Sequence, residues 1–465
     1  MRTLSDPVLA GLRTALTGAP DRPLVLVGNF EVEEHWGASE PGLPHMAMSG
    51  SRAIVNHMDE LALSLAGAGD YVLLKAAPDP EFLAYLHDLG LAVPTVLTPR
   101  AQDPVRTVTQ DALADPDLLD TLRGLAAVRA HLWAHGISED EERLTVGCGL
   151  RAAGPTAAVC KRVNSKIYSR LTADRLGIPQ PAGMVCRDTD EFDAACERAA
   201  SWLGAGRPVV LKDAYGVSGK GLLVVRDEAR LRQVRRLIAR RAERSGSRRL
   251  ALVMEEWLPK RTDLNYQFTV GRDGSVRYDF VKEALTEGGA HQGHRMPVRL
   301  TGAQSDGVRE AAHALGGALA ADGYFGVVGV DGLITEDDRL YPVLEINARN
   351  NMSTYQERLR AMFFDADRTA LAKRYPVRLR RRLPFGELRT LLDGLLLVDG
   401  SDGGVLINCF ATVNAGEPAG RSAAGETFEG RLYAVVVAGS PSRAEALDRE
   451  LARRLGTLAG SPVTG

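Results

Sequence analysis

The sequence predicts an α/β and α+β protein of about three domains. The first third alternates short apolar strands with amphipathic helical segments, the middle holds strand hairpins around a glycine-rich turn, and the last part places strands before a helix. A chain of 465 residues with 45% hydrophobic and 25% charged residues can form several sizeable cores. The shifts in pattern predict domains at 1–150, 151–376 and 377–465.

Composition excludes several classes of protein. A net charge of −2 offers no overall basic field for nucleic acid, and no apolar run is long enough to span a bilayer. The five cysteines show no CxxC pair or metal-ligand spacing, which indicates reduced thiols in a cytoplasmic protein. Only 8 of the 57 basic residues are lysines, so a lysine at a motif is informative.

The first domain is expected to be an open α/β sheet with short strands at residues 23–29, 70–76 and 94–99. A loop at 29–37 follows the first strand and carries Glu31, Glu33 and Glu34. Ligands of open α/β sheets bind at the carboxyl ends of strands, so these acids indicate a cationic or amine-bearing group. The alternative is a solvated loop with Trp36 packed beneath it.

Two helical stretches within 147–177 begin the second domain. The second helix opens at Lys166, after Ser165, and ends at a glycine before a proline. A lysine at a helix N-terminus opposes the helix dipole. An anionic ligand explains it, and tolerance at a surface position is the alternative.

The central motif is the stretch 207–225, an apolar strand ending at Lys212, a glycine-rich turn with Lys220, and a second apolar strand. Glycines let backbone N–H groups approach phosphate oxygens closely, here at Gly216, Gly219 and Gly221. The spacing does not match a P-loop, because a glycine follows Lys220 and a strand follows the turn. A hairpin turn without a ligand is the alternative.

A linker and an acidic residue follow the arginine-rich helix predicted at 230–249. The strand around Glu255 and Glu256 leads to a loop and then to Asp263. Such a segment can offer backbone groups to a nucleotide base and a carboxylate to a ribose hydroxyl. The alternative is an ordinary edge strand.

The most specific pattern is a predicted hairpin at 323–351. Asp331 ends one strand, and Glu345 and Asn347 lie two apart on the next, so they share a face. Two carboxylates and an amide suit Mg²⁺ that substrate phosphates also hold, whereas a buried unpaired carboxylate is costly. Arg349 continues the alternation on that face.

Two further segments are expected near the site. A loop at 283–297, which follows Lys282, is expected to line an acceptor pocket, where His291 or His294 can accept a proton; a surface loop with satisfied histidines is the alternative. The last domain is expected to be strands followed by a helix opened by Ser440. This α+β unit closes one wall of the active site or forms a dimer contact.

Taken in order, these motifs resemble the ATP-grasp superfamily, with its ATP-grasp fold preceded by a Rossmann-like pre-ATP-grasp domain. The resemblance implies two lysines and a mobile glycine loop on the phosphates: Lys166, Lys212, Gly216, Ser218, Gly219, Lys220 and Gly221. It implies an adenine-contacting linker with a ribose partner: Glu255, Glu256, Trp257, Leu258 and Asp263. It further implies metal ligands and a basic residue near an acyl phosphate: Asp331, Glu345, Asn347 and Arg349.

Residues 28–37 and 344–355, with a C-terminal α/β domain of similar size, resemble most closely the pheganomycin-type peptide ligases. This resemblance implies an ADP-forming carboxylate-amine ligase that uses ATP and Mg²⁺, with Mn²⁺ as a substitute. The expected substrates are a small carboxylate and an amine, such as an amino acid or short peptide, in specialised peptide (antibiotic) biosynthesis. Arg349, Lys282 and His291 are the expected catalytic residues, and a homodimer is compatible.

Two other functions use the same nucleotide site. A phosphotransferase needs no amine and yields a stable phosphorylated product. A nucleotide-sensing protein binds ATP without turnover, but it has no need of Arg349 beside an acyl phosphate.

Overall fold

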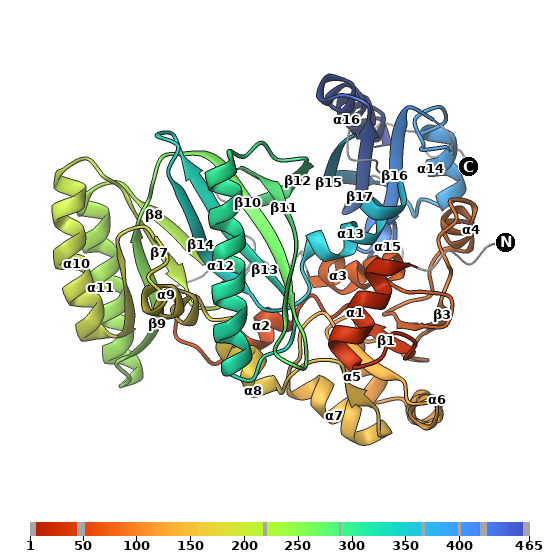
Figure 1. The fold of residues 1–465 in the computed structure, drawn as a ribbon, viewed down its shortest axis with the longest axis horizontal. Coiled ribbons are helices and arrows are strands. Elements are labelled where there is room, and N and C mark those ends of the chain that lie inside the picture. The colour runs from red at the N-terminus through yellow and green to blue at the C-terminus, as the bar shows by residue number, and fades with distance from the viewer. Residues whose placement is uncertain are drawn as a thin grey trace.

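This computed structural model describes residues 6–43, 52–216, 221–287, 290–363, 368–398, 401–418 and 426–458. Three sheets organise these residues: a five-stranded parallel sheet, a four-stranded antiparallel sheet and an eight-stranded antiparallel sheet. Figure 1 shows the four-stranded sheet on the left, the eight-stranded sheet through the centre to the upper right, and the parallel sheet below right.

The N-terminal part forms the parallel sheet, in the strand order β3-β2-β1-β4-β5. Its elements are α1 (Pro7–Thr17), β1 (Leu24–Val27), α2 (Val32–Gly37), α3 (Arg52–Asn56), η1 (His57–Ser64), β2 (Tyr71–Leu73), α4 (Pro80–Asp88), β3 (Thr95–Leu97), α5 (Val108–Leu113), α6 (Pro116–Ala127), β4 (His131–Ala134), α7 (Glu139–Cys148) and β5 (Arg151–Ala152).

Both faces of this sheet are covered, which is why its strands are continuously apolar. Leu24 and Leu26 face α1, η1 and α4, whereas Val25 and Val27 face α5, α6 and α7. Figure 1 shows α4 above β3 and α6 below it. The three predicted strands are confirmed, while the expected loop at 29–37 holds the short helix α2, where Trp36 is buried.

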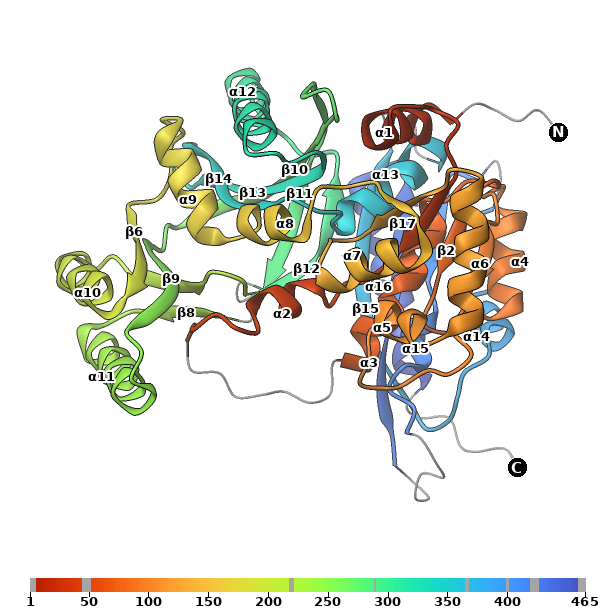
Figure 2. The same cartoon turned by 90° about the horizontal axis from the view of Figure 1, so that it is seen from below.

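The four-stranded sheet has the order β6-β9-β7-β8. The elements of this region are α8 (Ala157–Val163), α9 (Lys166–Arg175), β6 (Gly183–Asp188), α10 (Thr189–Gly204), β7 (Val209–Asp213), β8 (Leu222–Val225), α11 (Glu228–Ser245) and β9 (Arg249–Glu256). Helices α10 and α11 cover the outer face of this sheet (Figure 2). The predicted hairpin is confirmed, with Val209 paired to Val225.

The eight-stranded sheet has the order β14-β13-β10-β11-β12-β15-β17-β16. The remaining elements are β10 (Lys260–Val270), β11 (Val276–Glu287), β12 (Ala290–Met296), α12 (Gly302–Ala321), β13 (Gly326–Thr335), β14 (Leu340–Asn347), α13 (Met352–Phe363), β15 (Thr369–Leu379), α14 (Phe385–Leu391), β16 (Gly403–Cys409), α15 (Ala411–Asn414), β17 (Phe428–Ala438) and α16 (Pro441–Gly456).

Strand alternation decides what each face of this sheet contacts. On β10, Leu264, Tyr266 and Phe268 join the core beneath α12, whereas Asn265 and Gln267 turn to the opposite face, where side chains of α13 bond them. Figure 1 shows α12 in front of β10 and β13. The polar face of β10 is therefore available for a site.

The segment 283–297 was expected to be a loop, and that prediction is wrong. Its residues form the end of β11 and all of β12, because β11 pairs with β10 and β12 pairs with β15. β11 pairs with its neighbours in sequence, β10 and β12, whereas β15, the second partner of β12, lies more than 70 residues further along the chain, so the local glycine content was misleading.

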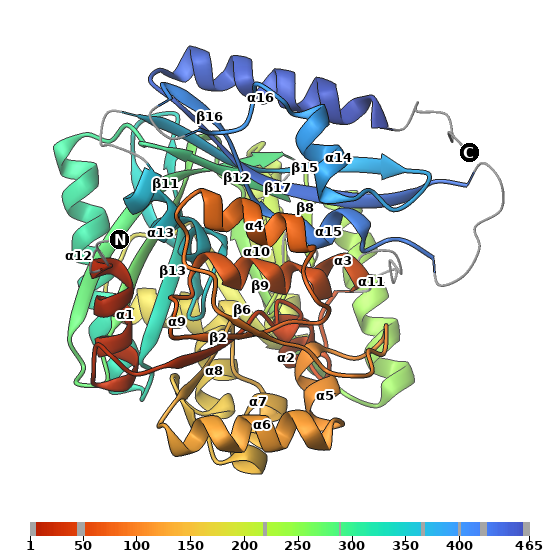
Figure 3. The same cartoon turned by 90° about the vertical axis from the view of Figure 1, so that its right-hand side faces the viewer.

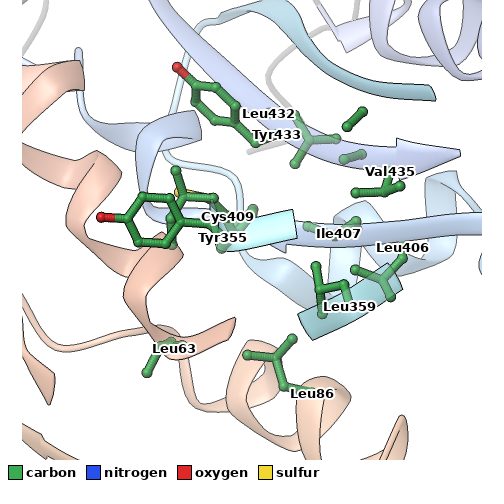
Figure 4. Close-up of a cluster of buried hydrophobic side chains, with 14 of the residues drawn as sticks. Leu63, Leu86, Tyr355, Leu359, Leu406, Ile407, Cys409, Leu432, Tyr433 and Val435 are labelled. Carbon is green, nitrogen blue, oxygen red and sulfur yellow. The ribbon is translucent and has the colours of Figure 1, made fainter. Parts of the chain in front are cut away.

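The C-terminal strands extend the central sheet, and α16 lies along them (Figure 3). Helix α16 is capped by Ser440, as predicted. Figure 4 shows Tyr355 and Leu359 of α13 between Leu63 and Leu86 of the N-terminal part and the strands β16 and β17. This shared core fixes the N-terminal part against the C-terminal strands.

Candidate active site

A cavity of about 290 Å³ lies between the four-stranded and the eight-stranded sheet. Its floor from the four-stranded sheet includes Val210 and Lys212, whose neighbours Val209 and Leu211 face α10 and α11 instead. Because side chains alternate between the two faces of β7, Lys212 faces the cavity while the apolar residues beside it pack against the helices on the other face of the sheet. We call this space the first cavity.

A buried carboxylate holds Lys212 in place. The Lys212 Nζ donates to Glu255 Oε2 at 2.5 Å, and Arg170 Nη1 donates to Glu255 Oε1 at 3.1 Å. Glu255 is 3% exposed, so its charge depends on these two cations. The side chain of Glu255, expected near adenine, is therefore committed to positioning Lys212.

Lys166 reaches the same cavity from the first turn of α9. Its Nζ donates to Glu345 Oε1 and to the Gly216 carbonyl oxygen, both at 2.7 Å. The lysine thus ties the eight-stranded sheet to the segment that follows β7. A cation at a helix N-terminus interacts unfavourably with the helix dipole, and the hydrogen bonds to these two acceptors compensate for that cost.

The carboxylates of Asp331 and Glu345 meet across the β13–β14 pair, because the two residues lie directly opposite in register. Asp331 accepts from Asn265 Nδ2 at 2.8 Å and from Asn347 Nδ2 at 3.2 Å. Burial, and then the Glu345 carboxylate, raise the pKa of Asp331 to about 6. A cation bound between the two carboxylates would relieve this repulsion.

These side chains fit a hard divalent cation. Two carboxylates and an amide supply oxygen ligands, and Mg²⁺ commonly takes one or two carboxylates together with substrate phosphates. Across the described ranges, no group of three or more His, Cys, Asp or Glu side chains is arranged to hold a metal ion. The donor set of Asp331, Glu345 and Asn347 therefore suits an ion that a ligand completes.

Arg349 lies at the edge of the first cavity and is fixed from another part of the chain. Its Nε donates to Glu33 Oε1 at 2.8 Å, and its Nη2 donates to Asn347 Oδ1 at 3.0 Å. Burial is the largest single effect and acts to lower the pKa of Arg349, but the charge and hydrogen bonding of Glu33 and the charges of Glu345 and Asp331 together outweigh it, and the pKa is raised. The guanidinium is thus charged and oriented beside the candidate metal ligands.

The far end of the first cavity is apolar, with a polar border. Glu256, Trp257 and Leu258 line it, and the Glu256 carboxylate pairs with Arg207 at 3.2 Å. Leu333 and Leu344 also line the first cavity. These apolar side chains suit a flat heteroaromatic base.

Asp263 also lines the first cavity. Its carboxylate accepts from Lys260 Nζ and from Thr286 Oγ1. The expected ribose partner thus lies beside the apolar slot, held by a cation and a hydroxyl.

The two histidines and Lys282 differ in their access to ligand. His291 and His294 line the first cavity with ring centroids 4.5 Å apart, and burial lowers the pKa of His291 to about 4. Lys282 is 1% exposed, donates to the Ser353 carbonyl oxygen at 3.1 Å and does not line the cavity. His291 is therefore a neutral group at the site, whereas Lys282 is buried outside the lining of the first cavity.

A second cavity of about 340 Å³ adjoins the first. The two cavities share Glu33, His291, Arg349 and Met352. Its remaining walls come from the N-terminal part, from α13 and from the strands β12, β15, β16 and β17. A ligand there would lie next to Arg349.

Comparison with known families identifies this arrangement. Residues 58–150 match the pre-ATP-grasp domain, and residues 171–353 match the ATP-grasp domain. The chain contains the pre-ATP-grasp and ATP-grasp domains of the ATP-grasp superfamily. This family binds ATP and a divalent metal ion.

Curated relatives of two kinds were found by sequence. The [butirosin acyl-carrier protein]–L-glutamate ligase of Niallia circulans is 26% identical over 306 residues, which are 66% of this chain and 67% of that protein. A formate-dependent phosphoribosylglycinamide formyltransferase of Burkholderia pseudomallei is 27% identical over 221 residues. The second match covers 46% of this chain and about half, 53%, of the relative.

Solved structures show the same fold at low identity. The ADP complex of N5-carboxyaminoimidazole ribonucleotide synthetase superposes with a TM-score of 0.52 at 14% identity, covering 87% of this chain and 96% of that one. The biotin carboxylase domain of Hydrogenobacter thermophilus 2-oxoglutarate carboxylase gives 0.51 at 16% identity, covering 86% and 87%. The predicted ATP-grasp fold with an N-terminal pre-ATP-grasp domain is confirmed.

Parts of the predicted phosphate loop lie outside the described residues. Gly216 and Gly221 are described, and both line the first cavity of this ATP-grasp chain. Ser218, Gly219 and Lys220 fall in the segment that the structure does not describe. Their roles stay predictions. Among the described helices, none is long and apolar enough to cross a membrane.

Sequence reasoning missed three residues of the site. Arg170 and Asn265 were given no role, and Glu33 was linked to a substrate amine instead of to Arg349. The alternation of polar residues in β10 was a signal for Asn265. No local signal pointed to Arg170 or to the pairing of Glu33, since their partners are far away in the sequence.

Proposed function

We propose that this protein is an ADP-forming ligase that activates a carboxylate as an acyl phosphate and joins it to an amine. The observation that carries the proposal is the shared position of Arg349. It lies where the first cavity, with its lysines and paired carboxylates, opens into the second. A nucleotide site that opens beside a charged arginine into a further cavity suits group transfer to a second substrate.

In this mechanism Lys166 and Lys212 bind the phosphates of ATP as point charges, and Glu255 and Glu345 orient these lysines. Asp331, Glu345 and Asn347 would hold a divalent cation, Mg²⁺ or Mn²⁺. Such a cation, when bound, neutralises charge on the transferring phosphoryl group. Glu33 and Asn347 hold Arg349 where it can bind the acyl phosphate and the tetrahedral oxyanion formed by the attacking amine.

His291 is the proposed acceptor of the amine proton. It lies in both cavities, and burial keeps its ring neutral at neutral pH. A neutral imidazole has a free lone pair, as general-base catalysis requires. Lys282 acts behind this site, through Ser353, which in turn bonds Asn265.

One curated relative supports ligase chemistry. The Niallia circulans protein is named as a ligase of L-glutamate to an acyl-carrier protein in butirosin formation, which supports a place in specialised metabolism. The N5-carboxyaminoimidazole ribonucleotide synthetase and the biotin carboxylase domain share the fold. Amide or peptide bond formation is the chemistry that we propose here.

The test is ADP release with Mg-ATP and a panel of free and N-capped amino acids, including L-glutamate, with hydroxylamine in place of the amine. ADP formed together with a hydroxamate would support carboxylate activation. A stable phosphorylated product without hydroxamate would favour the phosphotransferase. ATP binding with no turnover on any member of the panel would favour the nucleotide sensor.

A further inference from the structure

The second cavity contains two arginines without an acidic partner. Arg374 of β15 and Arg431 of β17 lie on one face of an antiparallel pair, since Arg374 is opposite Tyr433 and Arg431 is two residues before it. In the part of the chain that the structure describes, neither guanidinium forms an ion pair with a carboxylate. The side chain of Arg374 donates only to Gln292 Oε1, at 3.2 Å.

These two arginines repel each other. Both are partly buried, and burial together with the charge of Arg431 lowers the pKa of Arg374. Two neighbouring cations in a partly enclosed site need an anion to compensate them. A planar guanidinium matches a carboxylate through two parallel N–H donors.

The same cavity presents two unused acceptors. The side-chain oxygens of Gln356 and Asn408 have no hydrogen-bond partner among the described residues, and because both oxygens are buried, a ligand reaches them once these cavity-lining side chains rotate. Asn408 lines the cavity and lies where the pairing of β16 with β17 shifts register. Buried acceptors of this kind call for an N–H donor from a ligand.

The other charges of the cavity are already engaged. Glu33 pairs with Arg349, and Lys373 donates to both carboxylate oxygens of Asp448 at 2.8 Å. Glu34 also borders the cavity, and it too has an interaction partner. The cavity therefore offers a ligand two free cations and two free acceptors.

We infer that the second cavity binds an amino-acid substrate whose non-reacting carboxylate is held between Arg374 and Arg431. Its N–H groups donate to Gln356 and Asn408, and its reacting group faces Arg349 and His291. A bare phosphate would leave both acceptor oxygens unpaired, whereas an amino acid can pair with the two arginines through its carboxylate and with the two acceptor oxygens through its N–H groups. The volume of about 340 Å³ is at the small end for ligand pockets, which suits a free amino acid. This inference rests on the proposed ligase function, because it names the substrate class of that site.

The test is a calorimetric titration of the full-length protein, in the presence of Mg²⁺ and a non-hydrolysable ATP analogue. The titrants are the proteinogenic L-amino acids, and each one that binds is compared with the analogue in which its non-reacting carboxyl is a carboxamide. The variants are Arg374→Gln and Arg431→Gln. The matched control is Arg378→Gln, since Arg378 is on the same strand, exposed, and paired with Glu429 at 3.6 Å.

We expect at least one amino acid to bind, and its carboxamide to bind about tenfold or more weakly, because a hydrogen bond to a charged group is lost. Arg374→Gln and Arg431→Gln should each lower the affinity for the amino acid by a similar factor. Neither variant should further lower the affinity for the carboxamide by much, and Arg378→Gln should bind the amino acid as tightly as the wild type. Arg374→Lys, which retains charge without the planar fork, should give an intermediate affinity. If circular dichroism shows that Arg374→Gln is unfolded, Arg374→Lys tests the role of Arg374 in its place.

Binding of the carboxamides as tight as that of the amino acids would overturn the inference, as would wild-type affinity in both arginine variants or the absence of binding by every amino acid. The ligase proposal fails separately. Amino-acid binding that depends on the two arginines, without ADP release, would support the binding site and contradict the ligase proposal. Hydroxamate formation at the wild-type rate in both arginine variants would support the ligase proposal and contradict this binding site.

Discussion

At the scale of single residues, Glu345 is the side chain on which the candidate metal site depends most. It faces Asp331 across the hairpin and accepts from Lys166. Glu345→Gln removes a charge but little volume, so ADP formation should fall by about a hundredfold or more while the fold is kept. Steady-state kinetics with circular dichroism measures this. Glu336→Gln, an exposed change in the turn of the same hairpin, is the control, and equal rates in the two variants would contradict the site.

A second residue-scale prediction concerns pH. Burial, with the nearby charges of Glu141 and Asp59, raises the pKa of Glu31 from 4.5 to about 8. Between these values the folded state retains a proton that the unfolded state has lost, so the free energy of unfolding should fall as pH rises. Glu31 should lower the free energy of unfolding by about 1.4 kcal/mol for each pH unit in this range. Glu31→Gln should lack this contribution to the pH dependence.

Urea unfolding at pH 5, 6.5 and 8 measures that slope. Relative to the wild type, Glu31→Gln should gain stability as the pH rises across this window. Glu243→Gln, an exposed change on α11, should follow the wild-type profile. Parallel profiles for Glu31→Gln and the wild type would show that Glu31 titrates normally.

At the scale of elements, the hairpin β7–β8 depends on Gly221. Its φ is +78°, and an added Cβ would lie 2.5 Å from Asp213 Oδ2. Gly221→Ala should therefore cost about 1 kcal/mol of unfolding free energy and raise the KM for ATP, because Gly221 lines the first cavity. Gly204→Ala, at the end of α10 with open space around it, should be neutral. Wild-type KM and stability in Gly221→Ala would refute this role.

Elements set by local pattern could be predicted from the sequence. The hairpin β13–β14 follows from two apolar strands around a short turn, and its register places Asp331 opposite Glu345 as expected. The pairing of β12 with β15 was not predictable, because no short-range pattern specifies a partner that far along the chain. The division into three domains stays a prediction, and its boundary at 376 falls inside β15.

At the scale of the whole molecule, the site is assembled from distant segments. Glu33 of α2 and Arg349 after β14 are 316 positions apart, yet they form an ion pair with both side chains 12% exposed. Motifs predicted Arg349, but nothing near it in sequence indicated its partner. The pair therefore couples the placement of the N-terminal part to the geometry of the active site.

A double-mutant cycle with Glu33→Gln and Arg349→Gln tests this coupling. Each single change leaves a largely buried charge unpaired and should cost about 3 kcal/mol of unfolding free energy. The double variant should lose less than the sum, by about 1 to 3 kcal/mol, because neither charge remains. Glu33→Gln should also lower kcat with little change in the affinity for ATP, since the phosphate lysines keep their own partners. Additive losses, measured by urea unfolding, would mean that the two side chains act independently and that the N-terminal part does not orient Arg349.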